Sequence, residues 1–208
     1  MASKGARSHL RDPEWTRKSI LDAAEEEFAT QGLAGARTES IAERSGASKA
    51  MIHYHFDTKE KLYKAVIERA MTSRQEITRT IDIDAVDATT ALQNFSFAYL
   101  QACIANPHQS QVLLFEAVSN KGKYSKSLNL LHTYEVLTSI LKKGMDEGSF
   151  RQGDTMHMAV NIVGTLVFYF CARENLRALW PNRDLMESDL FEAHCQEAVK
   201  QVIAGVRA

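Results

Sequence analysis

The sequence has few of the residues that break helices or cross-link small folds. Its 208 residues include only 3 prolines, 10 glycines and 3 cysteines. Cysteines so few, so far apart and odd in number argue against a disulfide framework, so Cys103, Cys171 and Cys195 are expected to be reduced thiols. No apolar run approaches the roughly 18 residues of a membrane helix, and the polar opening segment lacks the apolar region of a secretory signal. These absences predict a cytoplasmic globular protein.

An excess of either charge is also absent. Lysine and arginine together number 25 against 26 aspartates and glutamates, which gives a formal net charge of −1. Proteins that bind nucleic acid neutralise phosphates with basic side chains, and this chain has no global positive field for that purpose. Any contact with DNA therefore needs a local basic surface.

Helical periodicity is present almost everywhere, and no convincing strand alternation occurs. Asp12 followed by Pro13 is expected to begin the first helix and Gly32 to end it, with the three glutamates of 25–27 on its solvated face. A long helix is expected to start at Thr58. Further helices are expected over roughly 88–105, 109–120, 124–147, 154–179 and 186–206. The chain is therefore predicted to be all-α, with about nine helices.

Two short helices joined by a tight turn lie between residues 37 and 56. Thr38 is expected to cap the first and Gly46 to end it, and Ser48 is expected to cap the second, which runs from Lys49 to His55. A glycine at the turn lets the chain reverse where a Cβ would clash. These are the dimensions of a helix-turn-helix.

The side chains of this segment divide into an inner and an outer set. The inner apolar set is expected to pack together: Ile20, Ala24, Phe28, Ile41, Ile52 and Phe56. The outer set is suited to phosphates and base edges: Ser48, Lys49, His53 and Tyr54. The division predicts a DNA-binding surface on the second short helix.

A longer composite pattern covers about fifty contiguous positions. It reads ILDAAEEEFATQGLAGARTESIAERSGASKAMIHYHFDTKEKLYKAVIER, with a first helix ending in Phe-x-x-x-Gly, an Ile-Ala-x-x-x-Gly second helix, an aromatic cluster closing on Phe, and a Thr-Lys-Glu-x-Leu start to the fourth helix. Residues 14–73 resemble the DNA-binding domain of the TetR family of bacterial regulators. The resemblance implies a helix-turn-helix head followed by a C-terminal ligand-sensing and dimerisation domain over 74–208.

The resemblance also implies roles for individual residues. Thr38 matches the residue that caps the second helix and touches a phosphate. Ser48 and Lys49 lie at the start of the recognition helix, where the family meets phosphates and base edges. Lys59 matches the lysine that opens the fourth helix and is aimed at a phosphate with the help of the helix dipole.

The aromatic cluster follows the family with one departure. Tyr54 and His55 resemble the positions that brace against the DNA backbone, whereas His53 stands where the family most often has tyrosine. Glu39 would repel phosphate unless it accepts a hydrogen bond from cytosine N4. His53 and His55 could suggest a metal, but residues two apart on a helix point about 200° apart, so no metal site is expected.

The C-terminal part is similar to the family only in general architecture, which implies helices that frame a ligand cavity. The candidate lining residues are large, apolar side chains with a few polar ones among them, as in ligand pockets. They are Phe95, Tyr99, Cys103, Phe115, Tyr134, Met158, Phe168 and Tyr169, with Glu116, His132 and Asn161 as polar contacts. The same residues at helical spacing are also typical of a plain core.

The last two helices are implied to form a four-helix dimer interface. The segment 156–179 is apolar on nearly every side, which a small monomer has few ways to bury. The expected contact is built from 154–179 and 186–206. It includes Val163, Val167, Phe170, Leu190, Val199 and Ile203.

The pattern and the resemblance together favour a homodimeric repressor that binds a palindromic duplex DNA operator and is released by a small-molecule effector. An architectural or activating DNA binder without such an input stays open, and a solid core without a cavity would favour it. A helical enzyme is not expected, because the Glu-x-x-His pairs of a carboxylate-metal bundle do not occur in the sequence. No cofactor is expected.

Overall fold

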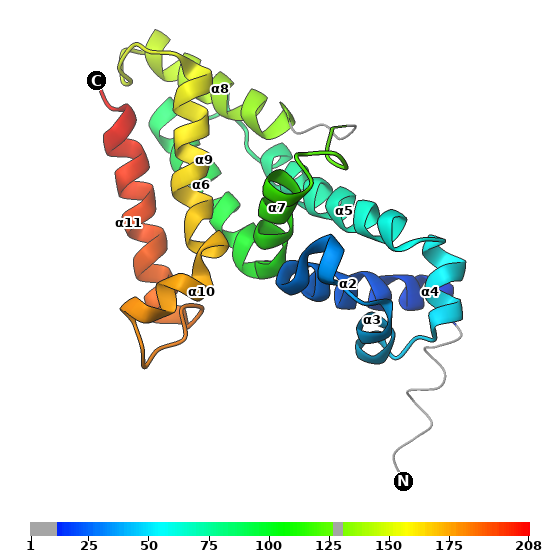
Figure 1. Ribbon diagram of the computed structural model, residues 1–208. Coiled ribbons are helices and arrows are strands. Elements are labelled where there is room, and N and C mark those ends of the chain that lie inside the picture. The colour runs from blue at the N-terminus through cyan, green and yellow to red at the C-terminus, as the bar shows by residue number, and fades with distance from the viewer. Residues whose placement is uncertain (1–11, 127–130) are drawn as a thin grey trace. The chain divides into compact units, whose positions relative to one another are not determined.

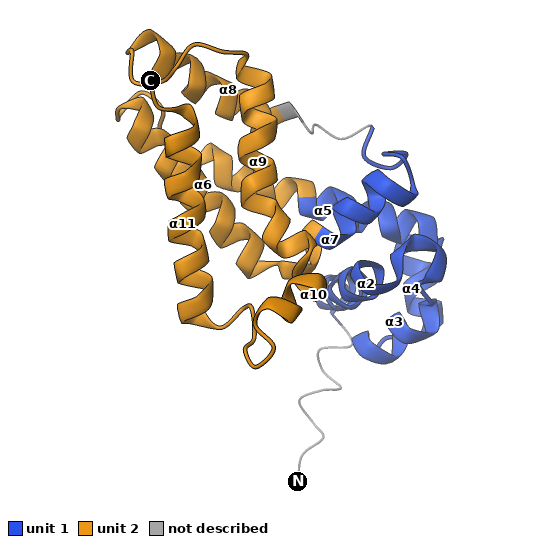
Figure 2. Ribbon diagram, turned by 60° about the vertical axis from the view of Figure 1, so that its left-hand side comes forward, with its two compact units in different colours: residues 1–70, 111–128 blue, residues 71–110, 129–208 orange. Residues whose placement is uncertain are grey.

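The computed structural model describes residues 12–126 and 131–208. These ranges contain ten α-helices, one 3-10 turn and a single isolated β-bridge, so the all-α prediction is confirmed (Figure 1). The chain divides into two compact units, which Figure 2 shows in two colours. Unit 1 comprises residues 1–70 and 111–128, and unit 2 comprises residues 71–110 and 129–208.

Unit 1 is built on helix α2 (Pro13–Gly35) and the short helices α3 (Thr38–Ser45) and α4 (Lys49–Phe56). Asp12 caps α2 as predicted, accepting a hydrogen bond from the backbone N–H of Glu14 at 3.0 Å. Gly32 has a φ of +62° and interrupts the helical geometry, so the expected break falls there even though hydrogen bonding resumes to Gly35. Helix α5 (Lys59–Arg79) begins in unit 1 and continues into unit 2.

The remaining helices agree with the sequence in part. They are α6 (Ala88–Ala105), α7 (Pro107–Ser119), α8 (Leu131–Asp146), α9 (Thr155–Cys171), α10 (Arg173–Leu176) and α11 (Ser188–Val206). The predictions over 88–105, 109–120 and 186–206 are confirmed within two residues. The helix expected over 154–179 instead ends at Cys171, and a separate turn of helix and a 3-10 turn (Arg177–Leu179) follow it.

The helix expected over 124–147 begins later, because Glu116 holds the preceding segment in turns. The Glu116 side chain is buried, and its carboxylate accepts the backbone N–H groups of Tyr124 (2.6 Å) and Ser125 (3.2 Å). Gly122 has a φ of +70° and donates its N–H to the Glu116 carbonyl at 3.0 Å. Part of the expected helix, residues 127–130, lies outside the described residues.

The core of unit 2 lies among α6, α8, α9 and α11. Phe170, Val199 and Ile203, which were expected at a subunit interface, belong to this core and are at most 7% exposed. The expectation was wrong for Phe170 because α9 is apolar on nearly every side and does not reveal which face packs inward. It was wrong for Val199 and Ile203 because the apolar face of α11 packs on α6 and α9 of the same chain. Val163, Val167 and Leu190 are half-buried against the same core.

The exposed apolar face of α9 is a different set of residues. Met156, Val160 and Phe168 are 47%, 50% and 61% exposed, and they follow one another with Gly164 at intervals of four residues. Residues four apart share a face of a helix. We call the four residues Met156, Val160, Gly164 and Phe168 the α9 stripe.

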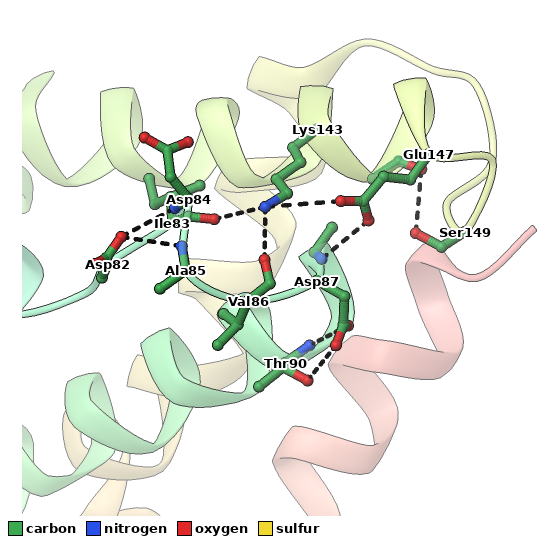
Figure 3. A network of polar contacts seen from close by, with 12 residues as sticks. Asp82, Ile83, Asp84, Ala85, Val86, Asp87, Thr90, Lys143, Glu147 and Ser149 are labelled. Atoms are coloured by element: carbon green, nitrogen blue, oxygen red, sulfur yellow. Dashed lines mark hydrogen bonds and ion pairs between the residues drawn. The ribbon is translucent and has the colours of Figure 1, made fainter.

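The loop between α5 and α6 is held by a network of polar contacts (Figure 3). The Lys143 ammonium donates to the carbonyls of Ile83 (2.7 Å) and Val86 (2.5 Å). Asp87 caps α6, and the hydrogen bond from the Thr90 N–H holds the pKa of the Asp87 carboxyl below its usual value. The acidic loop therefore has a defined structure fastened to α8.

Within the described ranges, no single helix is both long and apolar enough to cross a membrane. Helix α9 and the segment Arg173–Leu179 reach the required length and apolar composition only together, across a bend of 67°.

Candidate DNA interface and ligand site

The corner between α3 and α4 is fastened to α2. Gly46 ends α3 with a φ of +70°, and Ser48 caps α4 by accepting the N–H of Met51 at 3.2 Å, so both predictions are confirmed. The Ser19 hydroxyl on α2 donates to the Ser45 carbonyl at 2.9 Å. The turn is thereby held by one helical cap at each end and one link to the long helix.

The inner face of the corner is buried as predicted. Ile41, Ile52 and Phe56 are 0%, 5% and 6% exposed. Burying each such side chain stabilises the fold by about 1.5–3 kcal/mol. Because rotating α4 would expose two of them, their burial fixes which side of the recognition helix faces outward.

The outer face of α4 presents the polar set. Ser48, Lys49 and His53 are exposed, and Tyr54 is 83% exposed. His55 is half-buried, and its ring meets that of Tyr54 edge to face at 5.2 Å. Tyrosine is common at interfaces because its ring offers apolar contact and its hydroxyl can hydrogen-bond. The structure therefore brings four of the candidate DNA contacts to one exposed helix face.

Lys49 is paired with Glu39 across the corner. The Lys49 ammonium donates to the Glu39 carboxylate, and this hydrogen bond holds the pKa of the Glu39 carboxyl below its ordinary value. Both side chains are 60% exposed. The pair orients Lys49 and partly compensates its charge, so a phosphate or base edge must compete with Glu39 for the ammonium.

His53 contacts the turn that ends α4. Its Nδ1 lies 2.5 Å from the Asp57 carbonyl oxygen, and Asp57 has a φ of +65° inside a three-residue turn closed by Thr58 N–H to Phe56 O at 2.7 Å. A neutral imidazole that donates from Nδ1 keeps Nε2 as an acceptor. An acceptor in the major groove fits the amino groups of adenine or cytosine.

Lys59 is tied to the loop before α3. Its ammonium donates to the Ala36 carbonyl at 3.0 Å. This contact uses one of three N–H donors and leaves two for a phosphate. Lys59 is also the first residue of α5, where the positive end of the helix dipole favours an anion.

Thr38 does not cap α3, which corrects the expectation. Arg37 occupies the cap position with extended backbone, and its N–H is held by the Glu27 carboxylate at 3.0 Å. Thr38 is therefore the first helical residue, and its hydroxyl donates to Glu39 at 3.4 Å. Its contact with a phosphate stays a prediction.

The glutamates of α2 are not all on a solvated face. Glu25 and Glu27 are each 6% exposed. Glu25 accepts from Arg69 at 2.6 Å, and Glu27 lies 3.7 Å from Arg44. The expectation failed because both arginines come from other helices, and carboxylates are buried when such partners are available.

The residues expected to line a ligand cavity are distributed over both units. In unit 2, Phe95, Tyr99, Cys103 and Met158 are at most 5% exposed, and Tyr134 packs against the same core. The Phe95 and Tyr99 rings stack at 6.0 Å.

The other candidates lie elsewhere. Met158 and Asn161 line one groove of about 210 Å³ between α9 and α11. Phe168 is exposed on the α9 stripe, which contradicts an internal position, and His132 is half-buried 3.8 Å from Glu135.

The two candidates in unit 1 have structural partners. The Phe115 ring lies 3.2 Å from where a Cβ would stand on Gly32, so it packs directly on the break in α2. The Glu116 carboxylate is taken up by the N–H groups of the following loop. Glu116 therefore serves the fold of unit 1.

Comparisons with known proteins agree with this architecture. Residues 20–66 match the family model of the bacterial regulatory proteins of the tetR family, and residues 86–202 match the tetracyclin repressor-like C-terminal domain. The HTH-type transcriptional repressor NicS of Pseudomonas putida is 27% identical over 159 residues, which is 74% of this chain and 75% of that protein.

Two further matches extend the comparison. The nucleoid occlusion factor SlmA of Marinobacter nauticus is 28% identical over 137 residues, covering 66% of this chain and 70% of that protein. The structure of the ketosteroid transcriptional regulator KstR2 of Mycobacterium tuberculosis aligns with a TM-score of 0.74 at 20% identity, over 92% of this chain and 95% of that one. At that identity the likeness concerns the fold.

A helix-turn-helix head joined to a helical body, with these relatives, defines a DNA-binding transcription regulator. The chain belongs to the tetR family of bacterial regulatory proteins.

Proposed function

We propose that the protein is a repressor that binds a palindromic operator as a homodimer and leaves it when a small molecule binds unit 2. The exposed outer face of α4 carries this proposal. Ser48, Lys49, His53 and Tyr54 stand on a helix whose inner face is buried, so they are presented rigidly, as recognition of base edges requires.

Two arginines that the sequence analysis did not select add to the local basic surface. The Arg17 guanidinium lies over the Phe56 ring, 5.2 Å from its centroid, at the C-terminal end of α4. Arg37 is exposed directly before α3. The sequence did not reveal the contact of Arg17 because it joins α2 to the far end of α4, whereas Arg37 lies next to Thr38 in the chain.

The α9 stripe supports the homodimer. A row of apolar side chains left half exposed is a feature of interaction surfaces. A second copy of the chain can present the same row about a two-fold axis, and Gly164 in the row allows close approach of two helices. Two copies provide two recognition helices, which is what a palindromic operator needs.

Helix α5 supports the coupling between ligand and DNA. One continuous helix carries Lys59 in unit 1 and Arg74 in unit 2. A ligand that binds one arrangement of this helix more tightly than another shifts the population of the two and so the affinity for DNA.

The test begins with selection of bound sequences from random duplexes. Lys49→Ala and Tyr54→Ala should then weaken binding to the selected operator, measured by fluorescence anisotropy, far more than binding to random DNA. Lys142→Ala, which removes an exposed lysine on α8, is the matched control and should change neither. Equal losses on both kinds of DNA would show that α4 does not read bases.

A second candidate is an architectural DNA binder with no small-molecule input. The similarity to a nucleoid occlusion factor favours it, and so does the tight burial of Phe95, Tyr99 and Cys103. Operator affinity that no small molecule changes, together with many selected sites, would support this candidate over the repressor.

A further inference from the structure

Arg74 on α5 lies in a small polar cluster inside unit 2. Its Nη2 donates to the Ser110 hydroxyl at 3.1 Å, and its guanidinium carbon stands 5.5 Å from the centroid of the Tyr99 ring. The Ser110 hydroxyl also lies 3.8 Å from the Cys103 sulfur, and the Cys171 thiol donates to the Ser110 carbonyl at 3.5 Å. Helices α6, α7 and α9 thus each contribute residues around the Arg74 guanidinium.

No carboxylate compensates this charge. The described residues include every aspartate and glutamate of the chain, and none of them forms an ion pair with Arg74. The other two half-buried arginines of the described ranges do have such partners: Arg69 pairs with Asp22 and Glu25, and Arg173 with Glu174. Arg74 is the exception among them.

The neighbouring thiols do not supply the missing negative charge. Burial raises the pKa of both Cys103 and Cys171, while the Arg74 charge acts in the opposite direction and does not outweigh it. Both thiols are therefore neutral at physiological pH. A half-buried guanidinium that has a hydroxyl and an aromatic ring as neighbours, but no counterion, keeps its charge available to an external anion.

We infer that Arg74 binds the carboxylate of the effector, which is a small organic anion with an apolar body. This inference rests on the proposed function, since it names the chemical class of that effector. A guanidinium presents two parallel N–H donors to a carboxylate, and the Ser110 hydroxyl adds a third polar contact. The apolar body of the molecule would lie against the Tyr99 ring. Because Tyr99 and Phe95 are tightly buried in the ligand-free chain, the side chains around Arg74 must move apart to admit it.

The position of Arg74 connects this anion to the DNA head. Arg74 lies four residues beyond Ala70, the last residue of α5 in unit 1, and the same helix begins at Lys59. Binding of an anion at Arg74 therefore acts directly on the helix that carries a predicted phosphate contact.

The test uses benzoate as the probe and benzamide as its neutral counterpart of nearly equal shape. Binding of each to the full chain is measured by calorimetry at constant ionic strength set with NaCl. Benzoate should bind the wild type and benzamide should not. Arg74→Gln should weaken benzoate binding about 10- to 100-fold, the value of one charge-assisted hydrogen bond. Arg79→Gln, an exposed arginine on the same helix, should leave it unchanged.

Thermal unfolding without ligand gives a second readout. If the role of Arg74 is to bind a ligand, removing its uncompensated charge should leave the melting temperature at the wild-type value or raise it by about 2–4 °C. A structural arginine would instead lower it. A melting temperature that falls by several degrees in Arg74→Gln would overturn the inference. So would equal binding of benzoate and benzamide, or full binding of benzoate by the variant. The inference also fails if the wild type does not bind benzoate at about 10 mM, a concentration that still detects very weak binding.

Failure of this inference is distinguishable from failure of the proposed function. Arg74→Gln is also titrated with the selected operator in the absence of ligand. Operator binding that persists while benzoate has no effect refutes only the anionic effector. Absence of sequence-specific DNA binding by the wild type refutes the proposed function itself.

Discussion

A charge at the centre of the α9 stripe should separate the dimer. Met156, Val160 and Phe168 keep about half of their surface exposed in the single chain. Full burial of such a side chain is worth about 1.5–3 kcal/mol, so the exposed half contributes about 1 kcal/mol each. Three residues from each of two copies then supply about 6 kcal/mol to dimerisation.

Val160→Glu removes two of these contributions and places two carboxylates in the interface. An unpaired buried charge costs about 3–5 kcal/mol, and the two introduced carboxylates would also repel each other. The total exceeds about 6 kcal/mol, so the dissociation constant of the dimer should rise by at least about 10⁴.

Sedimentation velocity at micromolar concentration checks this result, with operator anisotropy on the same samples. Ser139→Glu, which adds the same charge at an exposed position of α8, should stay dimeric. A monomeric Val160→Glu protein should bind the operator only at the non-specific level, because one head loses the second half-site. A dimeric variant with wild-type operator affinity would refute the reasoning about the stripe.

Three further predictions concern the head and the fold. Lys59→Ala should weaken binding evenly across DNA sequences and lower the log–log salt slope by about 1; an altered operator preference would show that it reads bases. Lys49→Ala and His53→Ala should each cost about 1–3 kcal/mol on the operator and much less on random duplexes, as anisotropy can measure. Gly144→Ala should destabilise the fold by about 1–3 kcal/mol in urea titrations, because the new Cβ would overlap the buried Phe150 ring. Unchanged or greater stability in that variant would mean that the ring moves aside freely.

The head could be predicted from sequence because its signals are local. The cap at Ser48, the left-handed residue at Gly46 and the inward Ile52 and Phe56 each depend on residues within a few positions of one another. Such signals can be recognised from the sequence alone. The exception, Thr38, failed because Glu27 on another helix stabilises the cap position at Arg37.

The C-terminal part could be predicted less well because its outcome depends on packing between distant segments. Periodicity cannot orient α9, since nearly every position is apolar, and only the structure shows that Phe170 turns inward and Phe168 outward. Likewise, the pairing of Glu25 with Arg69 joins residues 44 positions apart. The missing partner of Arg74 was invisible for the same reason, because an absent ion pair can be recognised only when all neighbours are known.

The central claim is that the outer face of α4 reads DNA sequence, and the double variant Lys49→Ala/Tyr54→Ala tests it most directly. Its affinity for the selected operator and for a scrambled duplex is compared with that of the wild type at one salt concentration. The wild type should prefer the operator by about 10³ or more. The double variant should bind both duplexes with nearly equal, weak affinity while its helical circular dichroism and dimeric state stay unchanged. A double variant that still prefers the operator by the wild-type factor would contradict the account.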